Sequence, residues 1–126
     1  MSGPRMTVVD CGPLTLDKAK LVTMATGTVS VPSTVAIFDH PKHGVILWDT
    51  GCWEDVAEPD GPNAYWGQGI KTAFGAEAFT RDMAINKRLD KLGIKTSDVK
   101  YVIYSHLHLD HAGGMSYFPN AIHVMQ

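Results

Sequence analysis

Hydrophobic positions in the first half of the chain come in short runs separated by glycine and proline, a pattern typical of β-strands. The clearest runs are residues 33–39 and 44–51, which are both rich in β-branched and aromatic side chains. Weaker runs at residues 7–12 and 20–29 are further candidate strands. The link between the two clear runs, His-Pro-Lys-His-Gly, has turn chemistry, so we expect them to pair as an antiparallel hairpin.

The hydrophobic period changes in the second half. Residues 78–93 predict an amphipathic helix, with Thr80 as its N-cap and Gly93 as its stop. An apolar run at residues 99–105 predicts a strand covered on both faces, and residues 121–126 predict another strand. The helix is expected to have an apolar face of Ala78, Ile85, Leu89 and Leu92, and a polar face of Lys87, Asp90 and Lys91. Residues 52–75 have no sustained period and predict a long loop.

Composition restricts the class of protein. The 126 residues are 44% hydrophobic and 19% charged, which is typical of a single globular domain over residues 1–126. A net charge of −2 provides no basic surface, so neither nucleic acid nor a membrane is an expected partner. No apolar run reaches the roughly 20 residues that span a bilayer. The N-terminal segment does not resemble a secretory signal, and Cys11 and Cys52 form no Cys-x-x-Cys motif, which favours reduced thiols and a cytoplasmic location.

The highest density of residues that can bind metal is found at residues 105–114, Ser-His-Leu-His-Leu-Asp-His-Ala-Gly-Gly. His106 and His108 are two residues apart, so in an extended segment their imidazoles project to the same side and can bind one metal ion. Asp110 and His111 follow just before two glycines that let the chain turn, and can bind a second ion beside the first. Burying such residues unpaired costs several kcal/mol. We therefore expect a site for two divalent metals, with zinc first and iron, manganese or cobalt as alternatives.

This motif resembles that of the metallo-β-lactamase superfamily. His-x-His-x-Asp-His follows an apolar strand, and an upstream strand ends in Asp-Thr-Gly at residues 49–51. Within the superfamily, residues 31–126 are similar to the N-acyl-homoserine lactonases, through VILWDTG, the intervening helix and YVIYSHLHLDHAGGMSYFPNAIHVMQ. The resemblance implies an α/β fold: the N-terminal portion of an αββα sandwich, with a mixed, mainly antiparallel sheet and flanking helices.

The resemblance also implies a site and an activity. His106 and His108 would bind the first metal, Asp110 and His111 the second, and Asp49 would support the motif loop without binding metal. A simple turn residue at the strand end is an equal alternative for Asp49. The implied reaction opens the lactone ring of a small-molecule N-acyl-homoserine lactone by means of a hydroxide bound to both metals. Asp110 would pass a proton to the departing ring oxygen.

The family pattern is incomplete in this chain. Family members are longer, and supply a further His for each metal, a bridging Asp and a substrate-binding Tyr downstream of the segment that ends at Gln126. The chain is therefore expected to be truncated at its C-terminus, with two donors for each ion where a catalytic zinc usually has three. The alternatives are another superfamily hydrolase, such as a glyoxalase II-like thioesterase, and an inactive truncated fragment with a half-formed metal site.

Several other residues admit a functional interpretation, but a structural one is favoured for each. His40 and His43 lie in the predicted hairpin turn, and Cys52 is expected to be a small buried hydrophobe although it follows Asp-Thr-Gly. His123 is expected to be a hydrogen-bonded strand residue and not a substitute ligand. The loop aromatics predict a satellite core, with the wall of an acyl-chain pocket as the alternative: they are Trp53, Tyr65, Trp66 and Phe74.

Overall fold

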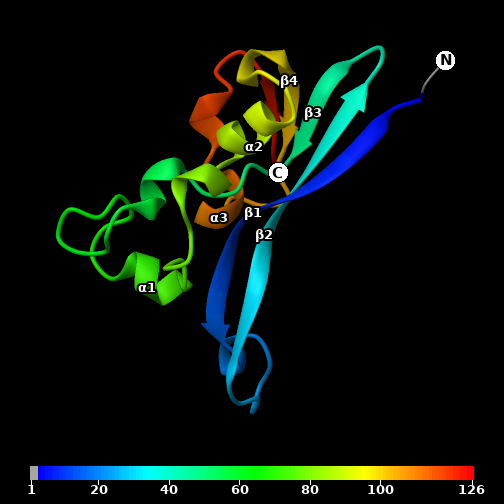
Figure 1. The fold of residues 1–126 in the computed structure, drawn as a ribbon. Helices are drawn as coiled ribbons and strands as arrows, with labels where there is room; N and C mark the ends of the chain where they lie inside the picture. Colours follow the sequence, from blue (N-terminus) through cyan, green and yellow to red (C-terminus); the bar gives the residue numbers. More distant parts are fainter. Residues whose placement is uncertain (1–2) are drawn as a thin grey trace.

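A computed structural model describes residues 3–126 of the chain as a five-stranded sheet with helices packed on one side (Figure 1). Met1 and Ser2, which begin the segment judged not to be a secretory signal, lie outside the described residues. The strand order is β1-β2-β3-β4-β5. The strands are β1 (Arg5–Asp17), β2 (Thr28–His40), β3 (Gly44–Trp48), β4 (Val99–Ile103) and β5 (Ile122–Val124).

The sheet is mixed, and its antiparallel part is the larger, as expected. β2 and β3 form the predicted antiparallel hairpin, from Ala36 opposite Trp48 to His40 opposite Gly44. β1 pairs with β2 in the same sense over most of its length. β4 and β5 then add in parallel to β3. The predicted strands are confirmed, with different ends, except at residues 20–29.

Helices cover one face of the sheet. Successive strand residues point to opposite faces, so every second residue of a strand faces the helices. Figure 1 shows α2 (Ile85–Lys91) lying across the strands on this side. Apolar burial between the two layers supplies the main stabilisation of the fold. The core between them consists of Cys11, Val35, Ile37, Val45, Leu47, Ile85, Leu89, Val99, Val102, Tyr104 and Phe118.

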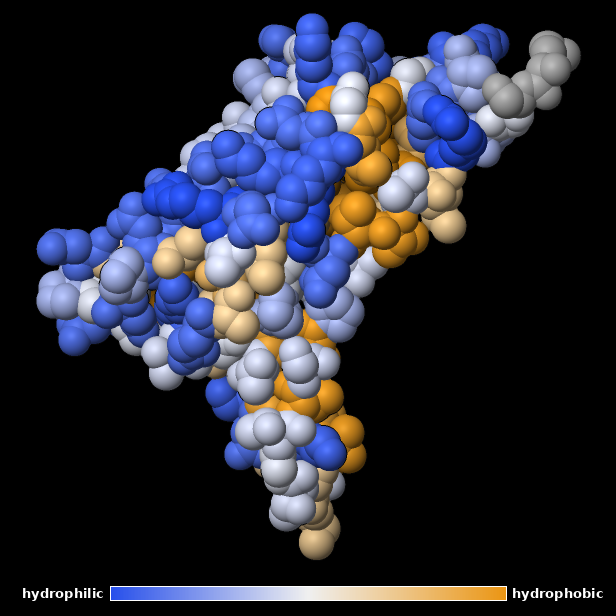
Figure 2. Space-filling model, viewed as in Figure 1, coloured by the Kyte–Doolittle hydropathy of each residue, from blue (hydrophilic) through white to orange (hydrophobic). Residues whose placement is uncertain are grey.

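The opposite face of the sheet is open and apolar. It is formed by the alternate strand residues Met6, Val8, Ala36, Phe38, Ile46, Trp48, Tyr101, Ile103, Ile122 and Val124. Figure 2 shows hydrophobic side chains gathered over the upper part of the sheet. None of these ten residues is charged, and Asp10, the next residue of β1 on this face, lies opposite Thr34. β4 was expected to be covered on both faces, but Tyr101 and Ile103 are only partly buried, so that expectation is wrong for this side.

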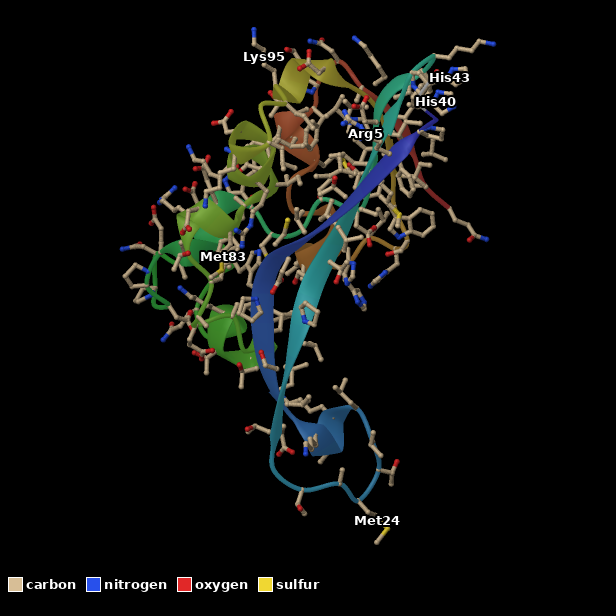
Figure 3. All side chains as sticks on the ribbon, turned by 45° about the vertical axis from the view of Figure 1, so that its right-hand side comes forward. Arg5, Met24, His40, His43, Met83 and Lys95 are labelled. Atoms are coloured by element: carbon tan, nitrogen blue, oxygen red, sulfur yellow. The ribbon has the colours of Figure 1, made fainter. Side chains whose placement is uncertain are left out.

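β1 and β2 continue beyond the body of the molecule as a hairpin arm, defined here as residues 13–32 (Figure 1). A bulge between Asp10 and Pro13 marks its base. The prediction of a strand at residues 20–29 is wrong, because most of this segment forms the tip of the arm. Met24 and Gly27 have φ of 63° and 85°, which reverse the chain there. Figure 3 shows Met24 at the extreme end of the arm.

The helix predicted for residues 78–93 is shorter than expected. Its N-terminal part is the separate 3₁₀ helix Arg81–Met83, and α2 begins only at Ile85 with Ala84 as its N-cap. Thr80 is therefore not the N-cap of α2, and its hydroxyl bonds instead to the carboxylate of Asp82. The backbone of Ala84 is extended, with ψ of 148°, and this interrupts the helix, so that two short helices form in place of one.

The end and the apolar face of α2 are predicted in part. Gly93 ends the helix as expected, with φ of 72°, while its N–H and that of Ile94 bond to the last carbonyls of α2. Ile85 and Leu89 are fully buried, which confirms their assignment to the core. Ala78 and Leu92 are exposed, so their assignment to that face is wrong.

Residues 52–75 form a largely irregular loop, as predicted, that includes α1 (Ile70–Phe74). The loop packs through a second core cluster of Leu14, Cys52, Val56, Ala76, Phe79 and Ala84. The remaining helices are α3 (Leu109–Ala112) and the 3₁₀ turns Lys18–Lys20, Glu54–Ala57, Thr96–Asp98 and Met115–Tyr117. None of the helices in residues 3–126 is long and apolar enough to cross a membrane.

Candidate metal centre

Asp49 stands at the carboxyl end of β3, where the backbone leaves the sheet. Its φ is 65°, a left-handed conformation that Asp and Asn tolerate better than other residues with a side chain. The N–H of Asp49 bonds to the carbonyl of Ile103 at 2.8 Å, which ties the ends of β3 and β4 together. Asp49 is only 3% exposed, so its carboxylate requires partners within the protein.

The partners of Asp49 come from the motif. Its Oδ1 accepts the Ser105 N–H at 2.7 Å, and its Oδ2 lies 2.6 Å from Ser105 Oγ. Oδ2 also lies 2.8 Å from Nδ1 of His111. The buried carboxylate therefore links the start of the motif to its last histidine, which is the supporting geometry that the resemblance implied for Asp49.

Thr50, the next residue, ties α3 to the end of β3. Its N–H and its hydroxyl both donate to the carbonyl of His111, each at 2.8 Å. The same hydroxyl accepts the N–H of Gly114 at 3.0 Å. Thr50 is fully buried, so these bonds are protected from water. Sequence reasoning assigned no such role to Thr50 or to Ser105, because their partners are 61 and 56 residues away in the chain.

Gly113 and Gly114 permit a close approach rather than an unusual backbone angle. A Cβ on Gly113 would lie 2.6 Å from the carbonyl oxygen of Leu109 and 2.8 Å from the Trp53 nitrogen. A Cβ on Gly114 would lie 2.9 Å from the carbonyl oxygen of Thr50. Any side chain here would therefore push α3 away from the strand end that positions it.

The four predicted motif residues are brought together. The ring centroids of His106 and His108 are 4.6 Å apart, and those of His106 and His111 are 4.1 Å apart. Nε2 of His111 lies 3.2 Å from Oδ2 of Asp110. As the side chains stand, no group of three or more His, Cys, Asp or Glu within residues 3–126 meets the geometry of a metal site. The residues converge, but they do not yet enclose a common point.

An apolar cavity of about 340 Å³ opens beside the motif. His108 and Asp110 line part of it, and the rest of its wall comes from the hairpin arm and α1. The apolar lining residues are Leu14, Leu16, Leu21, Val31, Ala73 and Phe74. A polar cluster thus adjoins a hydrophobic wall, an arrangement common in small-molecule sites.

The other candidate histidines lie outside this cluster. His40 is the last residue of β2 and His43 lies in the turn before β3, and Figure 3 shows both at the opposite end of the molecule from the tip of the arm. Nδ1 of His40 accepts the N–H groups of Lys42 and His43, so the turn interpretation is confirmed. His123 bonds through Nδ1 to the Tyr104 hydroxyl and through Nε2 to a backbone carbonyl, which confirms its structural role.

The cysteines and the loop aromatics are mainly structural. Cys11 and Cys52 are free, fully buried thiols, and burial raises the pKa of each to about 12. Trp53 stacks on Tyr117 at 4.2 Å between ring centroids, and also on Tyr65 at 6.4 Å. Trp53 and Trp66 pack against the second core cluster, which supports the satellite-core interpretation. Of the four aromatics, Phe74 alone lines the cavity beside the motif.

Comparison with known proteins identifies the class that this fold and motif define. Residues 27–126 match the sequence profile of the metallo-beta-lactamase superfamily. The chain therefore belongs to this superfamily, as the motif suggested.

Two curated relatives that match this chain are lactonases. The N-acyl homoserine lactonase AttM of Azorhizobium caulinodans is 38% identical over 96 residues, which span 76% of this chain and 35% of that protein. The N-acyl homoserine lactonase AiiB of Agrobacterium fabrum is 28% identical over an alignment 126 positions long, which covers 92% of this chain and 44% of that protein. The chain thus spans about a third to a half of the length of the curated relatives it matches.

A solved structure shows the same fold. A variant of AiiA from Bacillus thuringiensis, with N-decanoyl-L-homoserine bound at its active site, aligns with a TM-score of 0.79 and 27% identity. The alignment covers 98% of this chain and 48% of that protein. The five-stranded sheet with its helices is therefore the N-terminal portion of the fold seen in AiiA, which confirms the predicted fold class.

Proposed function

We propose that His106, His108, Asp110 and His111 bind two divalent metal ions, with zinc as the first candidate. The support is the spacing of donor atoms. Two ligands of one tetrahedral zinc ion, each about 2.0–2.1 Å from it, are about 3.3 Å apart. Nε2 of His111 and Oδ2 of Asp110 are 3.2 Å apart, so these two side chains fit a shared ion. The adjacent rings of His106 and His108 form the second pair of donors.

Four side chains provide two donors for each ion, whereas a catalytic zinc usually has three protein ligands. We therefore propose that the remaining donors come from outside this sequence. The lengths of the relatives are consistent with this, because each extends well beyond the part that this chain matches.

The proposed reaction is hydrolysis of the lactone ring of N-acyl-homoserine lactones. Divalent metals bound here would supply Lewis acidity and a hydroxide at neutral pH. Asp110 belongs to the motif and also lines the apolar cavity, which supports a role in proton transfer. Its carboxylate would take the proton of the attacking hydroxide and pass it to the departing ring oxygen. Because Cys11 and Cys52 are free thiols, we further propose a reducing compartment such as the cytoplasm.

The observation that carries the substrate assignment is the apolar cavity that begins at His108 and Asp110. An acyl chain is apolar, and each buried methylene contributes about 0.8 kcal/mol to binding. The lactone ring can then lie at the polar motif while the acyl chain lies between the hairpin arm and α1. A small polar ester would leave this cavity wall in contact with water.

Metal binding is tested on this chain directly. We expect zinc, measured by competition with a chromogenic chelator, to bind less tightly after His106→Ala or His111→Ala by about 10-fold or more. His43→Ala is the matched control, because His43 lies in the distant β2–β3 turn. Equal zinc binding by all of these variants and the parent chain would show that the motif is not the metal site.

Activity is tested on zinc-loaded protein expressed from the complete gene. We expect hexanoyl- and decanoyl-homoserine lactone to be converted to their ring-opened acids, and Asp110→Asn to lower the rate about 100-fold or more. Cleavage of a thioester in place of the lactones would favour the glyoxalase II-like alternative. Loss of all zinc from the 126-residue chain on dialysis, with no hydrolysis by that chain, would favour the inactive-fragment alternative.

A further inference from the structure

The hydrogen bonds around Asp49 fix the positions of several protons. A carboxylate offers acceptors only, so each of its neighbours must donate to it. The Ser105 N–H donates to Oδ1, while the Ser105 hydroxyl and Nδ1 of His111 both meet Oδ2. In a neutral His111 ring the proton must therefore be on Nδ1, which leaves Nε2 with a free lone pair.

The same reasoning extends through Ser105 to His106. A serine hydroxyl has one proton, and at Ser105 that proton is directed to Asp49 over 2.6 Å. Oγ of Ser105 also lies 2.9 Å from Nδ1 of His106, and with its proton already committed it can only accept there. The proton of His106 is thus on Nδ1 as well, and its Nε2 is also free.

We propose that Asp49 sets the tautomers of His106 and His111 together, directly at His111 and through the Ser105 hydroxyl at His106. Ser105 is a positioning residue that no sequence pattern singled out. Both imidazoles are held with the proton on Nδ1, so that both Nε2 atoms are free to bind a metal ion. This consequence for metal binding rests on the proposed metal site, whereas the tautomers themselves exist without metal.

The network matters because it opposes the intrinsic preference of histidine. A neutral imidazole in water prefers its proton on Nε2, which would block the atom that must bind the metal. Partners of Nδ1 are the usual means by which proteins select the other tautomer. At His111 the result is an unprotonated Nε2 that faces Oδ2 of Asp110 at 3.2 Å. Two acceptors at that distance repel each other, and a divalent metal ion bound between them would remove this repulsion.

The first test records the tautomers by two-bond ¹H–¹⁵N correlation spectra of the metal-free chain at pH 8. We expect the Nδ1–H form at His106 and His111 in the parent chain. Ser105→Ala should move His106 toward the Nε2–H form and leave His111 unchanged, and Ser105→Thr should restore the parent spectrum. His123 is an internal reference, because its Nε2 donates to the carbonyl of Phe118. An unchanged His106 spectrum in Ser105→Ala would overturn the role of Ser105.

The second test exchanges the acceptor for a donor. In Asp49→Asn the amide oxygen can keep the Ser105 N–H bond, so that the amide nitrogen replaces Oδ2. Asn tolerates the left-handed backbone at this position, so the fold is expected to survive. We expect both His111 and, through Ser105, His106 to move to the Nε2–H form. Asp98→Asn is the matched control, because Asp98 accepts a backbone N–H in an exposed turn. Retention of the Nδ1–H form by both histidines in Asp49→Asn would refute the proposal.

The consequence for metal is measured by zinc competition on the same chains. We expect Ser105→Ala to weaken zinc binding about 10-fold and Asp49→Asn up to about 100-fold, with recovery in Ser105→Thr. The effect at Ser105 is the smaller because the Ser105–His106 bond is exposed, while the bonds to Asp49 are partly buried. If the tautomers move as expected but even the parent chain binds no zinc, the tautomer assignment survives and the proposed metal site fails. If zinc binding is lost without any change in tautomer, the assignment fails and the metal site survives.

Discussion

Replacing Thr50 by valine removes two buried hydrogen bonds at almost constant shape. Oγ1 of Thr50 donates to the carbonyl of His111 at 2.8 Å and accepts the N–H of Gly114 at 3.0 Å. A buried hydrogen bond contributes about 1 kcal/mol, and a buried N–H left without a partner adds a penalty of about 1 kcal/mol or more. The His111 carbonyl retains the backbone N–H of Thr50, so Gly114 bears this penalty alone. We expect the free energy of unfolding to fall by about 2–4 kcal/mol.

The assay is urea denaturation followed by circular dichroism. A loss of this size lowers the midpoint by about 1–2 M, because a small protein loses about 2 kcal/mol of stability per molar urea. Thr34→Val is the matched control, since Thr34 is an exposed residue of β2 and should change stability by less than about 0.5 kcal/mol. If Thr50→Val costs no more than Thr34→Val, Thr50 does not fasten α3 to the end of β3.

Three further predictions concern the cavity, the motif glycines and the thiols. Leu21→Asp should lower kcat/KM for decanoyl-homoserine lactone about 10-fold and barely change kcat/KM for the butanoyl analogue. Val22→Asp, at the neighbouring position outside the cavity lining, should change neither value, and equal losses for both substrates in Leu21→Asp would exclude a role of the cavity in binding the acyl chain. Gly114→Ala should lower the free energy of unfolding by about 1–3 kcal/mol, because the new Cβ would lie 3.0 Å from Cγ2 of Ile85. Gly61→Ala is the control, because a Cβ there meets nothing within 4 Å, and similar denaturation midpoints for the two variants would contradict the close packing at Gly114. Burial raises the pKa of Cys11 and Cys52 from 9.0 to about 12, so between these pH values unfolding releases their protons and the free energy of unfolding should fall as the pH rises. Cys52→Ala should reduce the slope of stability against pH, and an unchanged slope would count against thiol burial as its cause.

The strands were predictable where local signals agree with tertiary burial. Residues 33–39 and 44–51 combine β-branched side chains with a turn between them, and the hairpin follows. Residues 20–29 carry similar apolar side chains, but they lie at the tip of the hairpin arm, where most of them are exposed. At Leu92, 46% exposed, the helical period continues past the point where α2 has left the core. Periodicity predicts which side chains can share a face and not how far that face is covered.

The sequence predicted which residues make up the motif, but it did not predict all of the residues that hold them in position. The order His-x-His-x-Asp-His indicated which side chains converge, and the structure brings them together. The residues that orient them are Thr50 and Ser105, whose small hydroxyls occur throughout any sequence and carry no local signal. Their roles depend on contacts between segments 56 to 61 residues apart, which local spacing alone cannot specify.

The open face of the sheet contains a tryptophan whose fluorescence can be measured. Trp48 lies on that face and is 43% exposed, whereas Trp53 and Trp66 pack against the second core cluster. Indole emission shifts to shorter wavelength when water is removed from around the ring, so Trp48 should respond to anything that covers this face. In thermal unfolding followed with a hydrophobic dye, the dye fluorescence should already be high before unfolding, because the native chain offers the dye an apolar surface. Intrinsic fluorescence at Trp48 therefore separates covering of the face from unfolding of the chain.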